Sequence, residues 1–202
     1  MKIEFSLDDG SKHDVMALAL LMKHDFSDRT TFYIPTIREL SDDEVVFISQ
    51  HAQIGGHTVT HPMDLKLLSG PELMKEIGGN KTYLEDLIGR PIDSFCYPRG
   101  RYNDHVKMAV RFSGFLNART TRVLQIFEGS DPYEKHTTIH MNPRDEYEGK
   151  DWLEVAEMML EKARKMPDKE TCFHVWGHSW EIEKNHDWSR FEKLLEILSN
   201  EE

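Results

Sequence analysis

The stretch that organises this sequence is residues 1–10, Met1-Lys2-Ile3-Glu4-Phe5-Ser6-Leu7-Asp8-Asp9-Gly10. Apolar and polar side chains alternate over it, which predicts a β-strand that runs into two adjacent carboxylates and a glycine. Neighbouring side chains on a strand point to opposite faces, so one aspartate can bind a metal while the other turns toward a substrate. Two carboxylates this close repel each other unless a cation or a proton intervenes. A surface turn is the alternative, because Asp-Gly is a common turn dipeptide.

A second stretch, residues 53–62, reads Gln53-Ile54-Gly55-Gly56-His57-Thr58-Val59-Thr60-His61-Pro62. It predicts another short strand, then a glycine pair and two histidines spaced i, i+4. On a single helical turn this spacing places both imidazoles on one side, close enough to share a cation. Alone it is a weak signal, since either histidine can be an ordinary surface or core residue. With the Asp-Asp strand end, one carboxylate and two histidines suit a divalent metal with open coordination positions.

These motifs resemble those of a known family. Ser6-Leu7-Asp8-Asp9-Gly10 looks like the Thr-Phe-Asp-Asp-Gly motif of the polysaccharide deacetylase family (NodB homology domain, carbohydrate esterase family 4). His57-Thr58-Val59-Thr60-His61 resembles its second motif, His-Ser/Thr-x-x-His. Phe95-Cys96-Tyr97-Pro98-Arg99-Gly100 is similar to the third motif, and Val175-Trp176-Gly177-His178 to the late histidine motif. The resemblance spans nearly the whole chain and implies a deformed (β/α) barrel with about seven parallel strands.

The resemblance also implies a role for individual residues. Asp9, His57 and His61 would bind the metal, usually zinc in this family, which lowers the pKa of its water and polarises the substrate carbonyl. Asp8 would be the general base that accepts a proton as water attacks an acetamide carbon. His178 would protonate the departing amine, because an amine is a poor leaving group without that proton.

The third motif departs from the family pattern. The family usually reads Arg-Pro-Pro-Tyr/Phe-Gly, and alignment of Pro98-Arg99-Gly100 with Pro-Tyr-Gly leaves Cys96 where the arginine belongs. The backbone N–H of Arg99 can still act as an oxyanion donor, because that role needs no particular side chain. Arg119, just after a predicted strand, is our candidate for the arginine that orients Asp8, with a solvated loop arginine as the alternative. The family's fourth motif, Asp-x-x-Asp-Trp, has no clear counterpart, and Asp151-Trp152 is left unmapped.

Several residues near the late motif are candidates for binding the substrate. His174, Trp176 and His178 alternate along one predicted strand and share a face. We prefer His178 as the acid because it lies at the strand end, and interpret His174 as a hydrogen-bonded core residue. Trp176 is expected to form a wall for the acetyl methyl or to stack on a sugar ring, with an ordinary core tryptophan as the alternative. Tyr97 and Arg99 of the third motif are also predicted to contact the substrate.

Strand and helix patterns alternate along the rest of the chain, which predicts a parallel sheet with its site at the carboxyl ends of the strands. Ser11 and Asp14 form a capping signal for the first helix. The pair Gly78-Gly79 marks a position where the third helix can break, at about 1 kcal/mol per glycine relative to alanine. Further strands are predicted at 30–35, 94–97, 114–118, 137–141 and 171–176, and helices at 15–22, 43–51, 69–87, 104–112, 151–166 and 190–198.

Composition sets the remaining bounds. The 202 residues, 39% hydrophobic and 30% charged, suit a single catalytic domain over residues 1–202. The net charge of -11 disfavours nucleic acid and anionic membranes as partners. No segment has the length and apolarity of a membrane span or a leader, so we expect a cytoplasmic protein, although a removed signal peptide would leave no trace. Cys96 and Cys172 are expected to be buried, reduced thiols rather than a disulfide.

The sequence thus predicts a metal-dependent hydrolase that removes an N-acetyl group from an amino sugar or glycan. Hydrolysis of a small non-sugar amide or ureide on the same fold is an alternative. A non-catalytic metal- or carbohydrate-binding protein is another. Asp8 argues against that last class, because a mere metal binder needs no second carboxylate beside its ligand. The oligomeric state is not predicted.

Overall fold

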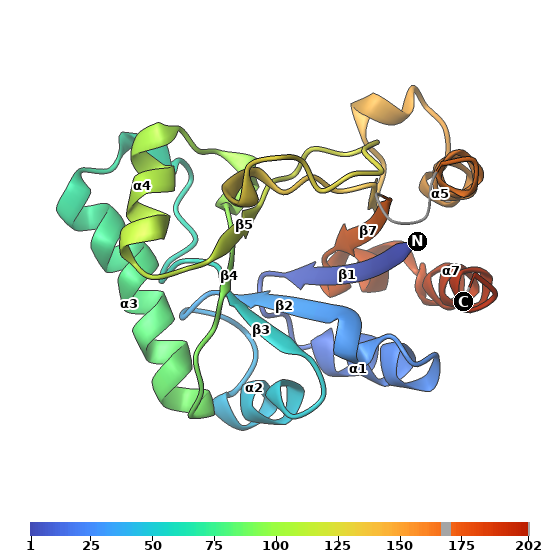
Figure 1. The fold of residues 1–202 in the computed structure, drawn as a ribbon. Helices are drawn as coiled ribbons and strands as arrows, with labels where there is room; N and C mark the ends of the chain where they lie inside the picture. The colour runs from blue at the N-terminus through green and yellow to red at the C-terminus, as the bar shows by residue number, and fades with distance from the viewer. Residues whose placement is uncertain (167–170, 202) are drawn as a thin grey trace.

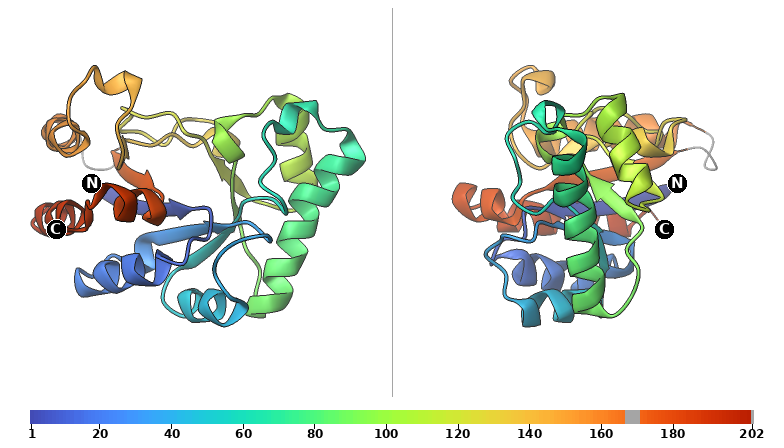
Figure 2. Two further views of the ribbon diagram at one scale, coloured as in Figure 1. Left: turned by 180° about the vertical axis from the view of Figure 1, so that it is seen from behind. Right: turned by 90° about the vertical axis from the view of Figure 1, so that its left-hand side faces the viewer.

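A single parallel sheet forms the centre of the molecule. The computed structural model describes residues 1–166 and 171–201. Seven strands lie in the order β5-β4-β3-β2-β1-β7-β6, and the sheet curls into a half-barrel with helices around it (Figures 1 and 2). This confirms the predicted deformed (β/α) barrel. The strands are β1 (Lys2–Asp8), β2 (Thr30–Ile34), β3 (Gln53–Gly56), β4 (Ser94–Cys96), β5 (Asn117–Arg119), β6 (Ile139–His140) and β7 (Cys172–Gly177).

The helices follow the strands along the chain and pack outside the sheet (Figure 1). They are α1 (Asp14–Lys23), α2 (Asp42–Ser49), α3 (Gly70–Ile88), α4 (Asp104–Phe112), α5 (Trp152–Arg164), α6 (Ser179–Asn185) and α7 (Trp188–Ser199). A capping box between Ser69 and Glu72 starts α3, and Gly89 in the left-handed region ends it. The helix runs unbroken through Gly78 and Gly79, so no break forms there.

The first strand shows how the sequence divides the inside of the half-barrel from the outside. Ile3, Phe5 and Leu7 are buried in the hydrophobic core. The alternate residues face the other way: Ser6 bonds to His174, and Asp8 to Arg119. The interior of the half-barrel is therefore polar along β1, and this polar row ends at the carboxyl edge of the sheet.

Two local predictions about the strand ends were wrong. The N-cap of α1 is His13, with no side-chain cap bond, whereas Ser11 was expected to cap this helix. Asp14 is instead fully buried and accepts a hydrogen bond of 2.6 Å from the Ser179 hydroxyl. The segment after β3 is an irregular loop rather than a helical turn, because Thr58 and His61 have positive φ values of 71° and 52°.

Two other predictions concern the thiols and the membrane. Cys96 and Cys172 are both free and buried, as expected. Among the helices within residues 1–166 and 171–201, none combines the length and the apolar character that crossing a membrane requires.

Candidate active site

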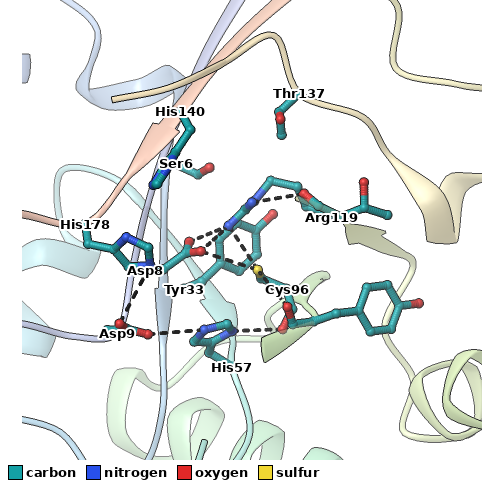
Figure 3. Close-up of polar contacts among 12 residues, drawn as sticks. Ser6, Asp8, Asp9, Tyr33, His57, Cys96, Arg119, Thr137, His140 and His178 are labelled. Atoms are coloured by element: carbon teal, nitrogen blue, oxygen red, sulfur yellow. Dashed lines mark hydrogen bonds and ion pairs between the residues drawn. The ribbon is translucent and has the colours of Figure 1, made fainter. Parts of the chain in front are cut away.

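The candidate site lies at the carboxyl edge of the sheet, where strands from distant parts of the chain end side by side. Asp8 is the last residue of β1, Arg119 the last of β5, and His57 and His178 directly follow β3 and β7 (Figure 3). A pocket of about 290 Å³ opens there, lined by Asp8, Asp9, His57, His61, Arg99, Thr121, Trp176, His178 and Trp180. The structure thus brings together most of the residues predicted from the motifs.

The predicted metal ligands converge on one point. Oδ1 of Asp9 lies 3.4 Å from Nε2 of His57 and 3.4 Å from Nε2 of His61. This oxygen is buried and has no hydrogen-bond partner among the described residues. A buried, unpaired carboxylate oxygen facing two imidazole nitrogens is the donor set that a divalent cation would satisfy. The residues present therefore fit a metal.

The protonation of these ligands also suits a metal. Nδ1 of His57 lies 2.8 Å from the carbonyl oxygen of Cys96, which can only accept, so Nδ1 donates this bond and Nε2 is the ring nitrogen that faces Asp9. Burial lowers the pKa of His61, and His57 lowers it further, which favours the neutral ring. Burial raises the pKa of Asp9, but the surrounding imidazoles lower it by more, so its carboxylate is ionised.

Asp8 is held by Arg119 inside the half-barrel. Nη2 of Arg119 donates to both carboxylate oxygens, at 2.5 Å to Oδ1, and lies 2.9 Å from Sγ of Cys96. Arg119 is fully buried, with its guanidinium 4.6 Å from the Trp176 ring centroid and 5.1 Å from that of Tyr33. Burial raises the pKa of Asp8, and Arg119, with nearby imidazoles, lowers it below its usual range. Arg119 is thus a buried partner of Asp8 rather than a solvated loop residue.

The strand register explains this contact. Cys96 on β4 and Arg119 on β5 are paired across the two strands. An arginine at either position can therefore reach the same space beside Asp8, and the small Cys96 side chain leaves room for the one on β5.

His178 is held by a carboxylate that the sequence analysis missed. Nδ1 of His178 lies 2.6 Å from Oε2 of Glu181, and Nε2 lies 3.7 Å from Oδ2 of Asp9. Glu181 also bonds to His140, at 3.1 Å, and to the Asn142 amide. Burial raises the pKa of Glu181, but these two histidines lower it to about 2. Burial lowers the pKa of His178, and Glu181 with the site aspartates raises it by more, so the net shift is upward.

The sequence signal that could have identified Glu181 is its position three residues after His178, because residues three apart at the start of a helix can contact each other. That helix, α6, was not predicted. Trp180 on the same helix was also missed: it lines the pocket, and its Nε1 donates to Oδ2 of Asp9 at 3.2 Å.

The predicted substrate-binding residues divide into two groups. Arg99 and Trp176 line the pocket. Tyr97 does not: its side chain is fully buried, its hydroxyl donates to the carbonyl of Tyr133 at 3.0 Å, and its ring stacks on Tyr102. A direct contact of Tyr97 with substrate is therefore not supported, because the backbone that follows β4 directs this side chain into the packed interior.

The two histidine candidates on β7 are well separated in environment. His174 is buried, bonds to the Ser6 hydroxyl at 2.8 Å, and does not line the pocket. Burial lowers its pKa to about 4. Trp176, between the two histidines, stacks on His140 with ring centroids 4.0 Å apart. Of the two histidines, only His178 faces the pocket.

The backbone at Arg99 is also suited to binding a ligand. Arg99 has φ 57° and ψ 13°, in the left-handed region. Its N–H donates to no acceptor among the described residues, whereas Gly100 and Arg101 bond back to Tyr97 and Pro98. The turn thus leaves one free donor next to the pocket.

Comparison with known proteins identifies a family and similar folds. A family model described as polysaccharide deacetylase matches residues 2–118. A Streptococcus pyogenes deacetylase solved with acetate has a TM-score of 0.61 and 22% identity, covering 67% of this chain and 62% of its own. A Bacillus cereus polysaccharide deacetylase has a TM-score of 0.58 and 25% identity, and the match covers 66% of this chain and 45% of that protein. A family 4 carbohydrate esterase from Streptomyces lividans, solved with acetate, has a TM-score of 0.63 and 12% identity. The match covers 98% of this chain and 89% of the esterase.

The match to the first two structures is partial, because it spans less than two thirds of the length of each: 62% and 45%. A search of curated proteins found no significant match.

Proposed function

Because the chain belongs to the polysaccharide deacetylase family, we propose that it is a metal-dependent hydrolase that removes an N-acetyl group from an amino sugar or glycan. One observation carries the proposal. The cation seat formed by Asp9, His57 and His61 lies in one pocket with a carboxylate, Asp8, and an imidazole, His178. Amide hydrolysis needs such a pair, one group to accept a proton from water and one to donate a proton to the amine. We assign this activity to one domain over residues 1–202.

We propose that Oδ1 of Asp9 and Nε2 of His57 and His61 hold a divalent cation, with zinc as the first candidate. When bound, the cation supplies a polarised carbonyl and an acidified water. That acidity matters here, because Arg119 lowers the pKa of Asp8 and makes its carboxylate a weak base.

The chain's own residues then move the protons. Asp8, fixed by Arg119, accepts a proton from the water whose oxygen forms a bond to the acetamide carbon. The free N–H of Arg99 donates to the oxyanion that develops on the carbonyl oxygen. His178, held by Glu181, gives its proton to the nitrogen as the carbon–nitrogen bond breaks. The products are acetate and the free amine.

The two tryptophans of the pocket are assigned to the substrate. Trp176 forms an apolar wall that suits the acetyl methyl group, and Trp180 lies partly exposed at the edge, where it suits a sugar ring.

The first test is metal content together with acetate release from N-acetylglucosamine oligomers. The purified protein should hold about one divalent ion per chain, and the double variant His57→Ala, His61→Ala should lose both ion and activity. A matched control replaces two exposed histidines outside the pocket, His105→Ala and His186→Ala. This control should keep both. Retention of the ion in the first double variant would remove the metal assignment.

A second variant separates the base from the metal. Asp8→Asn should keep the ion and lose acetate release by about 10²-fold or more, because a positioned base contributes that much. Acetate release equal to that of the parent would show that Asp8 is not the base.

A further inference from the structure

The side chain of Arg99 stands apart from every other arginine of the described chain. Each of the other ten makes a hydrogen bond, an ion pair or a ring contact: Arg29, Arg38, Arg90, Arg101, Arg111, Arg119, Arg122, Arg144, Arg164 and Arg190. Within residues 1–166 and 171–201, the Arg99 guanidinium makes none of these, yet Arg99 lines the pocket. The guanidinium is exposed at the edge of this pocket, so its N–H donors are open to an anionic group on a ligand.

The backbone holds Arg99 in this place at some cost. Its φ of 57° is a conformation that residues other than glycine seldom adopt, and such residues gather at ligand sites. The next residue, Gly100, also has a positive φ of 65°, and a Cβ there would collide with the Thr121 hydroxyl. The turn thus packs Thr121 closely against the glycine that follows Arg99.

Thr121 supplies a second free donor. It lines the same pocket, and no described residue forms a hydrogen bond with its hydroxyl, which lies against Gly100. A guanidinium and a hydroxyl on one pocket wall match the oxygens of a carboxylate, which arginine binds through parallel N–H donors.

Among the described residues of the pocket, no carboxylate balances the charge of Arg99. Asp8 is already neutralised by Arg119. Asp9 faces three imidazoles and the proposed cation seat. Because the chain as a whole carries a net charge of -11, its general field repels anions. An unpaired arginine at the site is therefore what admits an anionic ligand.

We propose that the substrate is an acetamide that also carries a carboxylate, and that the Arg99 guanidinium and the Thr121 hydroxyl bind this carboxylate at the exposed edge of the pocket. This inference rests on the proposed function for the acetamide and extends it to a substrate class. Two sources share the chemistry: an acidic amino sugar and an N-acetyl amino acid.

Equilibrium binding to matched pairs of probes tests the proposal. One pair is N-acetylmuramic acid and N-acetylglucosamine, which differ by a carboxylate-bearing ether. The other is N-acetylglycine and its neutral amide. Calorimetry on the metal-loaded protein should give a Kd about tenfold or more lower for the acidic member of at least one pair, since a hydrogen bond to a charged group has that effect. The pair that shows the preference identifies the source.

Variants connect the preference to Arg99. In Arg99→Gln the ratio of the two Kd values should fall to near one, whereas Arg99→Lys should keep part of it. The matched control is Arg101→Gln, because Arg101 is also exposed but is engaged with the Met63 carbonyl at 3.1 Å. This control should keep the full ratio. A carboxylate bound directly to the metal would give a preference that survives Arg99→Gln, and that result would overturn the proposal. Equal Kd values in the parent, or no binding of any probe, would overturn it too.

Acetate release from the same probes separates this inference from the proposed function. If binding shows an Arg99-dependent preference but no probe releases acetate, the carboxylate site is supported and the proposed deacetylase activity is refuted. If acetate is released but the Kd values of acidic and neutral members are equal, the deacetylase activity is supported and the carboxylate site is refuted.

Discussion

Replacement of Glu181 by glutamine tests whether this residue sets the proton of His178. The carboxylate accepts from Nδ1 of His178 at 2.6 Å, and both side chains are mostly buried. Glutamine keeps the size and the capacity for neutral hydrogen bonds to His140 and Asn142, so mainly the charge is removed. A hydrogen bond to a charged partner is worth roughly 1.5–3 kcal/mol. That free energy corresponds to a fall of about one to two units in the pKa of His178.

A lower pKa of His178 should change the pH dependence of activity in a defined direction. The amine accepts a proton only from protonated His178, so activity is lost as pH rises through the pKa of His178. In Glu181→Gln, this alkaline limb of the kcat/KM profile should move to lower pH by about one to two units. Metal content should not change. The control is Glu183→Gln on the same helix, because Glu183 bonds to Trp188 and does not line the pocket. An alkaline limb that stays in place in Glu181→Gln would refute the reasoning.

Three further predictions concern stability. Arg119→Met should lower the free energy of unfolding by roughly 3–5 kcal/mol in urea denaturation, because it leaves Asp8 charged and unpaired in a buried position; a loss under about 1 kcal/mol would contradict this. Burial raises the pKa of Asp14 to about 8, so the folded state keeps a proton that the unfolded state releases near its ordinary value, and stability should fall as pH rises between the two. Asp14→Asn should therefore flatten the dependence of Tm on pH over this range, and an unchanged slope would count against the shift. Gly100→Ala should cost roughly 1–3 kcal/mol, measured by thermal unfolding, because its φ is positive and the new methyl meets Thr121, and an unchanged Tm would contradict this.

The fold was predictable because its signals are local. Strand patterns alternate with helical spacing along the chain, and a parallel sheet covered by helices is the arrangement that such a pattern favours. The errors lie where local signals are weak. The strand expected at 114–118 forms at Asn117–Arg119, and the one at 137–141 is only Ile139–His140. Both strands lie at the margins of the sheet, where few neighbours extend them. The helix Ser179–Asn185 was missed because a short polar segment shows little periodicity.

The pairing of His57 and His61 was predicted with the wrong local structure. A helical turn was expected to bring the rings together, but the loop does so with two positive φ values, and the ring centroids lie 4.9 Å apart. The residue spacing carried the information about proximity, whereas the conformation depends on contacts with distant residues. The backbone N–H of His57, for example, donates to the side chain of Asn80 on α3. No single stretch of sequence contains both partners of such a contact.

The residues that hold Asp8 and His178 illustrate a more general limit. A motif fixes a residue by its position in the chain, but an ion pair requires only that two groups occupy neighbouring space. Strands β4 and β5 run side by side, so the guanidinium beside Asp8 can come from either of them, and here it comes from Arg119. In the same way, Glu181 on the helix after β7 reaches Nδ1 of His178 from its own turn of chain. The partner of a site residue is therefore best sought among all positions that the sheet register places beside it, and a motif that lacks its expected residue does not by itself indicate that the interaction is lost.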